Sequence, residues 1–201
     1  MARLDYVDLA GASDEPRALF DRLPINLTRM LLHSPHIAKG FLDLAIGFRQ
    51  GVLDPKLRET VILRVATDQD SLYQRMQHLP AADLAGLSDE EVDAITRGDL
   101  TRLDPRLAVA VRFVDECVTR VKVSDPTFED ARSVFSPSEI VEMTLLTGFY
   151  MMTARFLATL SVDLDAQPVD WSRSDRLASR PCEYVAGFLG PAWKDPPATY
   201  R

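Results

Sequence analysis

The chain has 201 residues, of which 46% are hydrophobic and 26% are charged, and its formal net charge is -7. This length and composition suffice for one domain with a proper core. The negative charge argues against nucleic-acid binding through a basic patch and against contact with anionic membrane surfaces.

Two further features of the sequence bear on location. No apolar run approaches the ~20 residues that cross a bilayer, and the acidic start of the chain lacks the hydrophobic stretch of a signal peptide. Cys117 and Cys182 lie far apart, in different predicted elements, so we expect no disulfide framework. We therefore predict a cytoplasmic protein.

Helix signals recur along the chain, whereas strand and hairpin signals are weak. Several predicted helices start with a serine or aspartate followed by proline. Proline is tolerated in the first helical turn because its missing N–H is not needed there. The predicted starts, in chain order, are after Ser13, at Asn26, at Ser34, at Asp54, near Ser71, at Ser88, at Asp104, at Ser124 and at Ser136.

The helix predicted from about Ser71 to Ala85 contains Pro80, which should bend it, and Gly86 is placed to end it. Ser88, with a glutamate three residues later, has the pattern of a capping box.

The last long helix reaches about Leu160 and is apolar nearly all round, so we expect it to be central or to lie in a subunit interface. We interpret Tyr150 and Arg155 within it as structural, and Arg155 as paired with Glu142, Glu59 or an acidic residue of a neighbouring subunit.

These signals divide the chain into three parts. Residues 1–14 form an N-terminal arm, 15–165 a helical domain, and 166–201 an extension that we expect to pack along the surface through its aromatic residues. The extension is rich in proline and aromatic residues, namely Pro168, Trp171, Pro181, Tyr184, Phe188, Pro191, Trp193, Pro196 and Pro197.

The segments 53–66, 71–80 and 85–92 together carry a family resemblance. The residue types, their order, and the residues that start and end the helices are similar to those of the core helical hairpin of the carboxymuconolactone decarboxylase and alkyl hydroperoxidase D-like (AhpD-like) superfamily. The segments 123–128 and 139–155 are similar to the C-terminal helices of the same group. The resemblance covers roughly residues 15 to 165. It implies an all-α AhpD-like bundle, no bound cofactor and a homo-oligomer, as a dimer, trimer or hexamer.

In the hydroperoxidase branch of this family, a glutamate faces a Cys-x-x-Cys-x-x-x-His motif on the next helix. Carried over by position, the glutamate is Glu59 and the histidine is His78, while the cysteine positions hold Ser71 and Gln74. Disulfide chemistry needs a thiolate, so we do not expect peroxidase activity. Many cysteine-free relatives carry Tyr-Glu-Trp before the histidine, from which this chain also departs at Gln74 and Arg75.

Glu59 and His78 are our candidate catalytic residues. A carboxylate beside an imidazole fixes its tautomer and forms a general acid/base pair. The alternative is a buried hydrogen bond that only joins two helices.

Five residues are candidates for substrate binding, each with a structural alternative. Gln74 shares a helix face with His78, Tyr73 sits on the neighbouring face, and Ser71 near the helix start could receive an anion or simply cap the helix. Arg64 and Arg75 could bind a carboxylate, or make ordinary ion pairs.

We expect no metal site, because His33 and His36 are separated by a prolyl turn and His78 is the only other histidine. The leading hypothesis is a cofactor-independent enzyme, a lyase or isomerase, that moves a proton on a small organic substrate by decarboxylation, isomerisation or cyclisation. The first alternative is a non-catalytic oligomeric ligand-binding or scaffolding protein, and the second is residual peroxidase activity.

Overall fold

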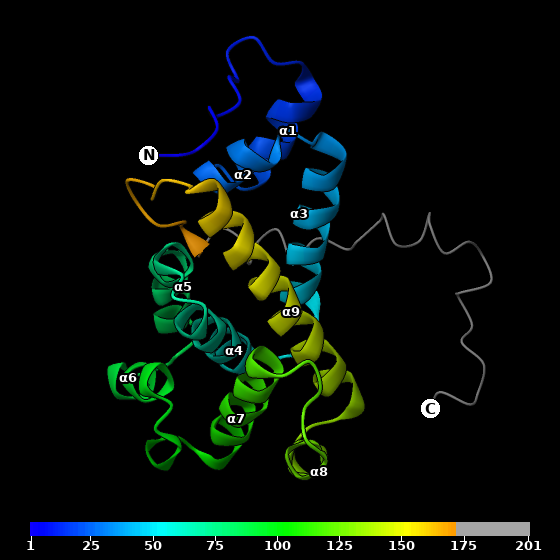
Figure 1. The fold of residues 1–201 in the computed structure, drawn as a ribbon, viewed down its shortest axis with the longest axis vertical. Helices are drawn as coiled ribbons and strands as arrows, with labels where there is room; N and C mark the ends of the chain where they lie inside the picture. Colours follow the sequence, from blue (N-terminus) through cyan, green and yellow to red (C-terminus); the bar gives the residue numbers. More distant parts are fainter. Residues whose placement is uncertain (172–201) are drawn as a thin grey trace, which may run out of the picture.

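The computed structural model describes residues 1–171, and this part of the chain contains helices but no strand, which confirms the all-α prediction. Nine α-helices and one 3₁₀-helix follow one another within it (Figure 1). They are α1 (Asp14–Arg22), α2 (Asn26–Leu31), α3 (Pro35–Gln50), α4 (Pro55–Asp68), α5 (Leu72–Leu84), α6 (Asp89–Arg97), η1 (Leu100–Arg102), α7 (Pro105–Thr119), α8 (Asp125–Val134) and α9 (Pro137–Leu160).

The predicted helix boundaries agree with the capping chemistry. The Asp54 carboxylate accepts a hydrogen bond from the backbone N–H of Leu57 at 3.0 Å, so it caps α4. Ser88 and Glu91 form the capping box of α6, which ends at Gly98 with φ of 66°. Helix α5 continues through Pro80 and is followed by Gly86 with φ of 83°. Both glycines adopt the left-handed conformation that ends helices at little steric cost.

Helix α4 is the centre of the fold and packs against α5, α6, α7 and α9. Its buried face includes Leu57, Val61 and Val65, none of them measurably exposed. They belong to the larger of two hydrophobic clusters, which also takes in residues of α7 and α9. Because α4 is buried on nearly all sides, any polar group on it must find a partner inside the protein.

A smaller hydrophobic cluster joins the N-terminal helices to the end of α9. It includes Leu27 of α2, Leu42 of α3, Tyr73 of α5 and Leu157 of α9. Figure 1 shows α1 and α2 at one end of the molecule and α8 at the other, with α3 and α9 extending between these ends. The two clusters therefore divide the interior along the length of α9.

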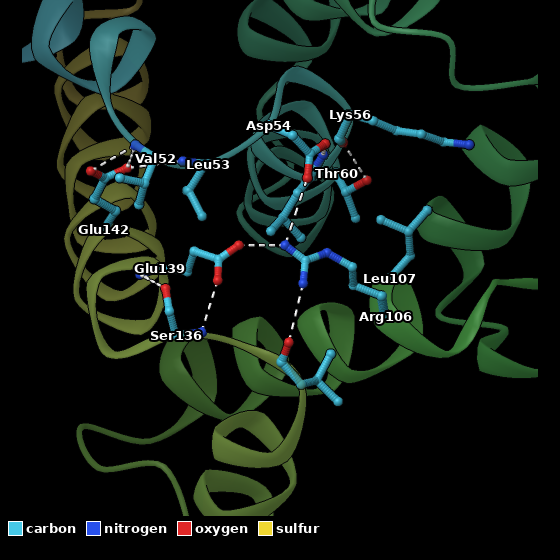
Figure 2. A network of polar contacts seen from close by, with 12 residues as sticks. Val52, Leu53, Asp54, Lys56, Thr60, Arg106, Leu107, Ser136, Glu139 and Glu142 are labelled. Carbon is cyan, nitrogen blue, oxygen red and sulfur yellow. Dashed lines mark hydrogen bonds and ion pairs between the residues drawn. The ribbon is translucent and has the colours of Figure 1, made fainter.

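Polar contacts fix the start of α4 to α9 (Figure 2). The Glu142 carboxylate accepts hydrogen bonds from the backbone N–H groups of Val52, at 2.8 Å, and Leu53, at 3.2 Å. A Cβ atom on Gly51 would lie only 2.3 Å from the same carboxylate, so a side chain at this position would displace Glu142 from these contacts.

Beside this contact, Arg106 of α7 binds Glu139 of α9 and the backbone carbonyl of Val134, and it approaches Asp54 to 3.8 Å. Figure 2 shows these groups converging on the turn that enters α4. Residues further along α4 are thereby held at a defined position relative to α9.

Of the pairings expected for Arg155, those with Glu142 and Glu59 are wrong, whereas pairing with an acidic residue of a neighbouring subunit stays a prediction. Arg155 is exposed and donates to the backbone carbonyl of Met151 at 2.9 Å, while Glu142 binds the amides that precede α4. The physical reason is position, because Arg155 lies on the solvent side of α9 and needs no buried partner.

The two ends of the described chain meet. The backbone N–H of Arg3 donates to the carbonyl of Leu160 at 2.9 Å, and that of Ala2 donates to the Asp163 carboxylate at 3.1 Å. Residues 163–171, which we call the C-terminal strap, then return along α5. The rest of the predicted extension, including Cys182 and Trp193, lies outside the described residues.

In the part of the chain that the structure describes, no helix combines the length and the apolar character needed to span a bilayer. The cytoplasmic location stays a prediction.

Candidate active site

The helices α4 and α5 bring Glu59 and His78 into direct contact. Nδ1 of His78 lies 2.8 Å from Oε2 of Glu59, and the two residues are 4% and 0% exposed. Since a carboxylate only accepts hydrogen bonds, Nδ1 of His78 carries the hydrogen and donates it. The other carboxylate oxygen accepts from Nε of Arg58, which is also buried, at 3.2 Å. The predicted pair is therefore assembled, with an arginine as a third member.

The charges around Glu59 keep it ionised. Burial would raise the pKa of the Glu59 carboxyl, but His78, Arg58 and Arg49 together outweigh burial and hold the pKa below its ordinary value. A permanent carboxylate behind the imidazole stabilises a positive charge on His78 whenever the ring takes up a proton.

Tyr150 of α9 completes a chain of hydrogen bonds from the other side of the imidazole. Its hydroxyl lies 3.0 Å from Nε2 of His78, and the two rings meet edge to face at 5.1 Å. In the neutral imidazole Nε2 is bare, so the Tyr150 O–H donates to it. Burial and the nearby Glu59 charge raise the Tyr150 pKa, which keeps this hydroxyl protonated. Sequence reasoning took Tyr150 as structural and missed this role.

His78 and Tyr150 both face a cavity of about 100 Å³. Glu59 does not line it and supports His78 from behind. Most of the wall is apolar and comes from α2, α3, α9 and the α1–α2 turn. Helix α5 supplies four polar side chains, and Arg22 of α1 and Arg49 of α3 also line the cavity. The apolar lining residues are Leu23, Ile25, Leu27, Phe41, Leu42, Ala45, Ile46, Phe149 and Leu157. An apolar pocket with a few convergent polar groups has the usual composition of a small-molecule site.

The C-terminal strap forms one wall of this cavity. The Trp171 indole lies 5.1 Å from the His78 ring and donates its N–H to the backbone carbonyl of Gln77. The guanidinium of Arg49 lies over the Trp171 ring, 4.1 Å from its centroid. Trp171 and Arg49 were not among the residues predicted from the sequence.

Asp165 anchors the strap. Its carboxylate accepts hydrogen bonds from the backbone N–H of Asn26 at 2.8 Å, from Nε2 of Gln77 at 2.9 Å and from the Tyr73 hydroxyl. Burial and this bond to a carboxylate raise the Tyr73 pKa, so Tyr73 acts as a hydrogen-bond donor. Tyr73 lines the cavity, and its hydroxyl holds the strap, while its predicted role in substrate binding stays a prediction.

Gln74 also lines the cavity and is 2% exposed. Its Nε2 donates to the backbone carbonyl of Tyr150 at 2.9 Å, which ties α5 to α9. Among the described residues, its Oε1 has no hydrogen-bond partner.

Comparisons with known proteins agree with this architecture. Residues 35–116 match the carboxymuconolactone decarboxylase family. The fold is similar to the AhpD core of an uncharacterised peroxidase-related protein from Ralstonia eutropha JMP134, with a TM-score of 0.71, 19% identity and coverage of 82% of this chain and 93% of that one. The chain is thus similar to the carboxymuconolactone decarboxylase family over residues 35–116, and its fold is that of AhpD-like structures.

Two other solved structures share the fold. One is a putative antioxidant defence protein AhpD from Agrobacterium tumefaciens, with 18% identity, a TM-score of 0.63 and coverage of 68% and 96% of the two chains. The other is the debrominase Bmp8, with 14% identity, a TM-score of 0.65 and coverage of 86% and 94%. No curated protein matches the sequence.

Among the described residues 1–171, no cysteine lines the cavity. Ser71 and Gln74 occupy the family's cysteine positions. Cys117 lies on α7, where burial and the neighbouring Glu116 charge raise its thiol pKa to about 11. A thiol with that pKa is almost entirely protonated at neutral pH and is a poor nucleophile.

Three predicted binding residues do not line the cavity. Ser71 sits at the N-cap position of α5, but its side chain makes no capping hydrogen bond. Arg64 binds Asp68 at 3.0 Å, Asp115, and the carbonyl of Ile95 at 3.0 Å. These contacts of Arg64 are ordinary ion pairs and hydrogen bonds within the protein, which was the alternative to binding a substrate carboxylate.

Arg75 likewise turns away from the cavity. Its Nη1 donates to the hydroxyl of Thr67 at 3.0 Å and lies 3.4 Å from that of Thr96. Arg64 and Arg75 therefore contact the helices on the opposite side of α4 and α5 from His78.

The described residues 1–171 contain no group of three or more histidine, cysteine, aspartate or glutamate side chains placed to hold a metal ion.

Proposed function

We propose that the protein is a cofactor-independent enzyme in which Glu59 and His78 move a proton on a small organic substrate bound in the cavity. The observation that carries this proposal is the hydrogen-bond chain Glu59–His78–Tyr150, which begins at a buried carboxylate and ends at a tyrosine that lines the cavity. Decarboxylation, isomerisation and cyclisation of a small organic acid or lactone each require such a transfer.

The direction of transfer follows from the hydrogen bonds. A substrate proton passes to the Tyr150 oxygen as the Tyr150 proton moves to Nε2 of His78, giving a substrate anion and an imidazolium. Glu59 stabilises this imidazolium through Nδ1–H, at 2.8 Å. The same proton transfers in reverse order return the proton to another atom of the substrate. The hydrogen-bond chain is thereby restored without net consumption of protons.

The fold neighbours add an independent reason to expect a small ring compound. A cysteine-to-alanine variant of the debrominase Bmp8 was solved in complex with 2,3,4-tribromopyrrole, with 12% identity to this chain, a TM-score of 0.66 and coverage of 89% and 97%. That ligand belongs to that protein, and we use it here only in support of a cavity for small organic molecules.

A proton-exchange experiment with two simple ring compounds tests the proposal, whatever the natural substrate is. Cyclopentanone and γ-butyrolactone are incubated with the protein in deuterated water, and NMR follows the loss of their α-protons. We expect the wild-type protein to accelerate exchange and Glu59→Gln and His78→Ala to lose about 100-fold or more of that acceleration. His36→Ala, at an exposed histidine, is the matched control and should exchange like the wild type.

Two results would contradict the proposal. If both variants keep full activity, this pair is not catalytic. If the wild-type protein accelerates exchange of neither probe, the ligand-binding alternative replaces the enzyme.

We also propose that the protein is a homo-oligomer. On α9, the spacing of Val141, Leu145 and Met152 places them on one helix face, and they are 57%, 57% and 50% exposed. Sedimentation velocity measures the mass in solution, and a monomer at micromolar concentration would rule the proposal out.

A further inference from the structure

The permanently charged side chains that line the cavity are all of one sign. Arg22 of α1 and Arg49 of α3 line it, whereas none of its described lining residues is an aspartate or a glutamate. Apart from His78, the other lining side chains are apolar or carry neutral polar groups. Positive charges in an apolar wall favour an anionic group, because such a wall keeps out part of the water that would screen them.

The two arginines differ in their distance from the proposed chemistry. Nη2 of Arg22 lies 2.8 Å from the carboxylate of Asp43, which is exposed. Burial is the largest single influence on the pKa of Glu59 and of Tyr150, but the Arg49 charge acts on both groups, in the direction that lowers the pKa. Arg49 is therefore the lining cation whose charge reaches the proton-transfer chain, whereas Arg22 belongs to a surface ion pair.

The contact with Trp171 holds Arg49 in an orientation that suits a carboxylate. The guanidinium lies over the Trp171 ring, 4.1 Å from its centroid. Such stacking uses the face of a guanidinium, whereas its N–H donors lie in its plane and match the two oxygens of a carboxylate. The indole is itself fixed, because its N–H donates to the backbone carbonyl of Gln77. The C-terminal strap thus orients the cation that an anionic ligand would meet.

The size and lining of the cavity limit the ligand to a small body with one charge. A volume of about 100 Å³ is somewhat below the ~150 Å³ of an engineered apolar cavity that binds benzene, so the body is no larger than about one ring. Leu42, Phe149 and Leu157 line much of the space, and a second carboxylate among them would lose water without gaining a partner. Glu59 opposes an anion only weakly, because it lies outside the lining and pairs with Arg58 at 3.2 Å.

We propose that the cavity binds a monocarboxylate with a small apolar body, and that Arg49 is the residue that receives its carboxylate. The body then lies against Leu42, Phe149 and Leu157, and the carboxylate lies toward the end of the cavity that holds Tyr150. The inference rests on the proposed function only in naming this acid as the substrate class, because the binding itself needs no catalysis.

Calorimetric titrations of cyclopentanecarboxylate and cyclopentanecarboxamide at neutral pH test the requirement for an anion. The two compounds share one ring and differ in a carboxylate against a neutral amide of nearly the same size. A cavity without an available cation would prefer the amide, because a carboxylate costs more free energy to remove from water. We expect the wild-type protein to bind the carboxylate about tenfold more tightly or better.

Arg49→Gln removes the charge while keeping a side chain with hydrogen-bond donors, and should abolish the preference for the carboxylate. Arg97→Gln, at an exposed arginine of α6, is the matched control and should keep it. Equal or weaker binding of the carboxylate by the wild-type protein, or binding of neither compound, would overturn the inference without any variant. A preference that survives in Arg49→Gln would also overturn it, since the carboxylate would then bind elsewhere.

The outcome can be separated from that of the exchange experiment. Selective binding of the carboxylate without proton exchange would remove the proposed function and leave this inference standing. Exchange that depends on His78, with no selectivity for the carboxylate, would do the reverse.

Discussion

Two groups of paired charges lie on opposite sides of α4, one partly buried and one fully buried, and they differ in where their hydrogen bonds lead. Arg64, Asp68 and Asp115 pair with one another between α4 and α7, and the remaining Arg64 donors reach backbone carbonyls. Glu59 and His78 instead pass their hydrogen bonds on to Tyr150 at the wall of a cavity. Buried charge alone therefore does not mark a site in this fold. The distinguishing feature is a hydrogen-bond chain that reaches a space large enough for a ligand.

The largest expected effect comes from breaking the Glu59 group. Glu59→Ala leaves the buried Arg58 without its carboxylate and His78 without its acceptor, and removal of one member of a buried ion pair costs about 3–5 kcal/mol of unfolding free energy. Urea denaturation followed by circular dichroism measures this loss.

Arg75→Met is the comparison on the other side of α4, where the acceptors are neutral threonine hydroxyls, and it should cost about 1 kcal/mol. Equal costs for the two substitutions would mean that the Glu59 ion pairs contribute no more to stability than hydrogen bonds from Arg75 to neutral hydroxyls.

A smaller effect is expected from pH at Asp68. Burial raises the Asp68 pKa to about 6 from 3.8 and the nearby Asp115 adds to this, although Arg64 acts in the opposite direction. Between these two pH values the folded protein binds more protons than the unfolded chain, so this group makes the protein less stable as pH rises through the window. The full difference in unfolding free energy is on the order of 3 kcal/mol.

Asp68→Asn should remove that dependence, so that the stability of the wild type relative to the variant falls between pH 5 and pH 7. Urea midpoints at a series of pH values provide the measurement, and Glu59 does not interfere because its pKa is lowered in both proteins. A constant difference between the two proteins across the series is the contrary result.

The helices could be predicted from the sequence because their signals are local. Asp54, Ser88 and Ser136 each bind a backbone N–H within the next three residues, so each start is encoded in a few adjacent positions. The pairing of Glu59 with His78 was predictable from the family motif, although the residues are 19 positions apart.

The rest of the site depends on contacts that no local pattern encodes. Tyr150 lies 72 positions from His78, and in the sequence it is one aromatic residue in an apolar helix. Trp171 lies 94 positions from its partner Gln77. The proline-rich, aromatic character of the extension signalled a segment that packs along the surface, but not which surface. Arg64 and Arg75 show the converse, because a charged residue close to the motif in sequence can point to the other side of its helix.

The position of Asp165 has a consequence for the order in which the protein is built. It joins the backbone of Asn26 to the side chain of Gln77, across sequence separations of 139 and 88 residues. During synthesis, α2 and α5 leave the ribosome well before the strap does. In a nascent chain that has already formed its central helices, the cavity still lacks the wall that the strap supplies. This wall is added only after Trp171 has emerged. Ligand capture is thus a property that a growing chain acquires only after the strap has emerged.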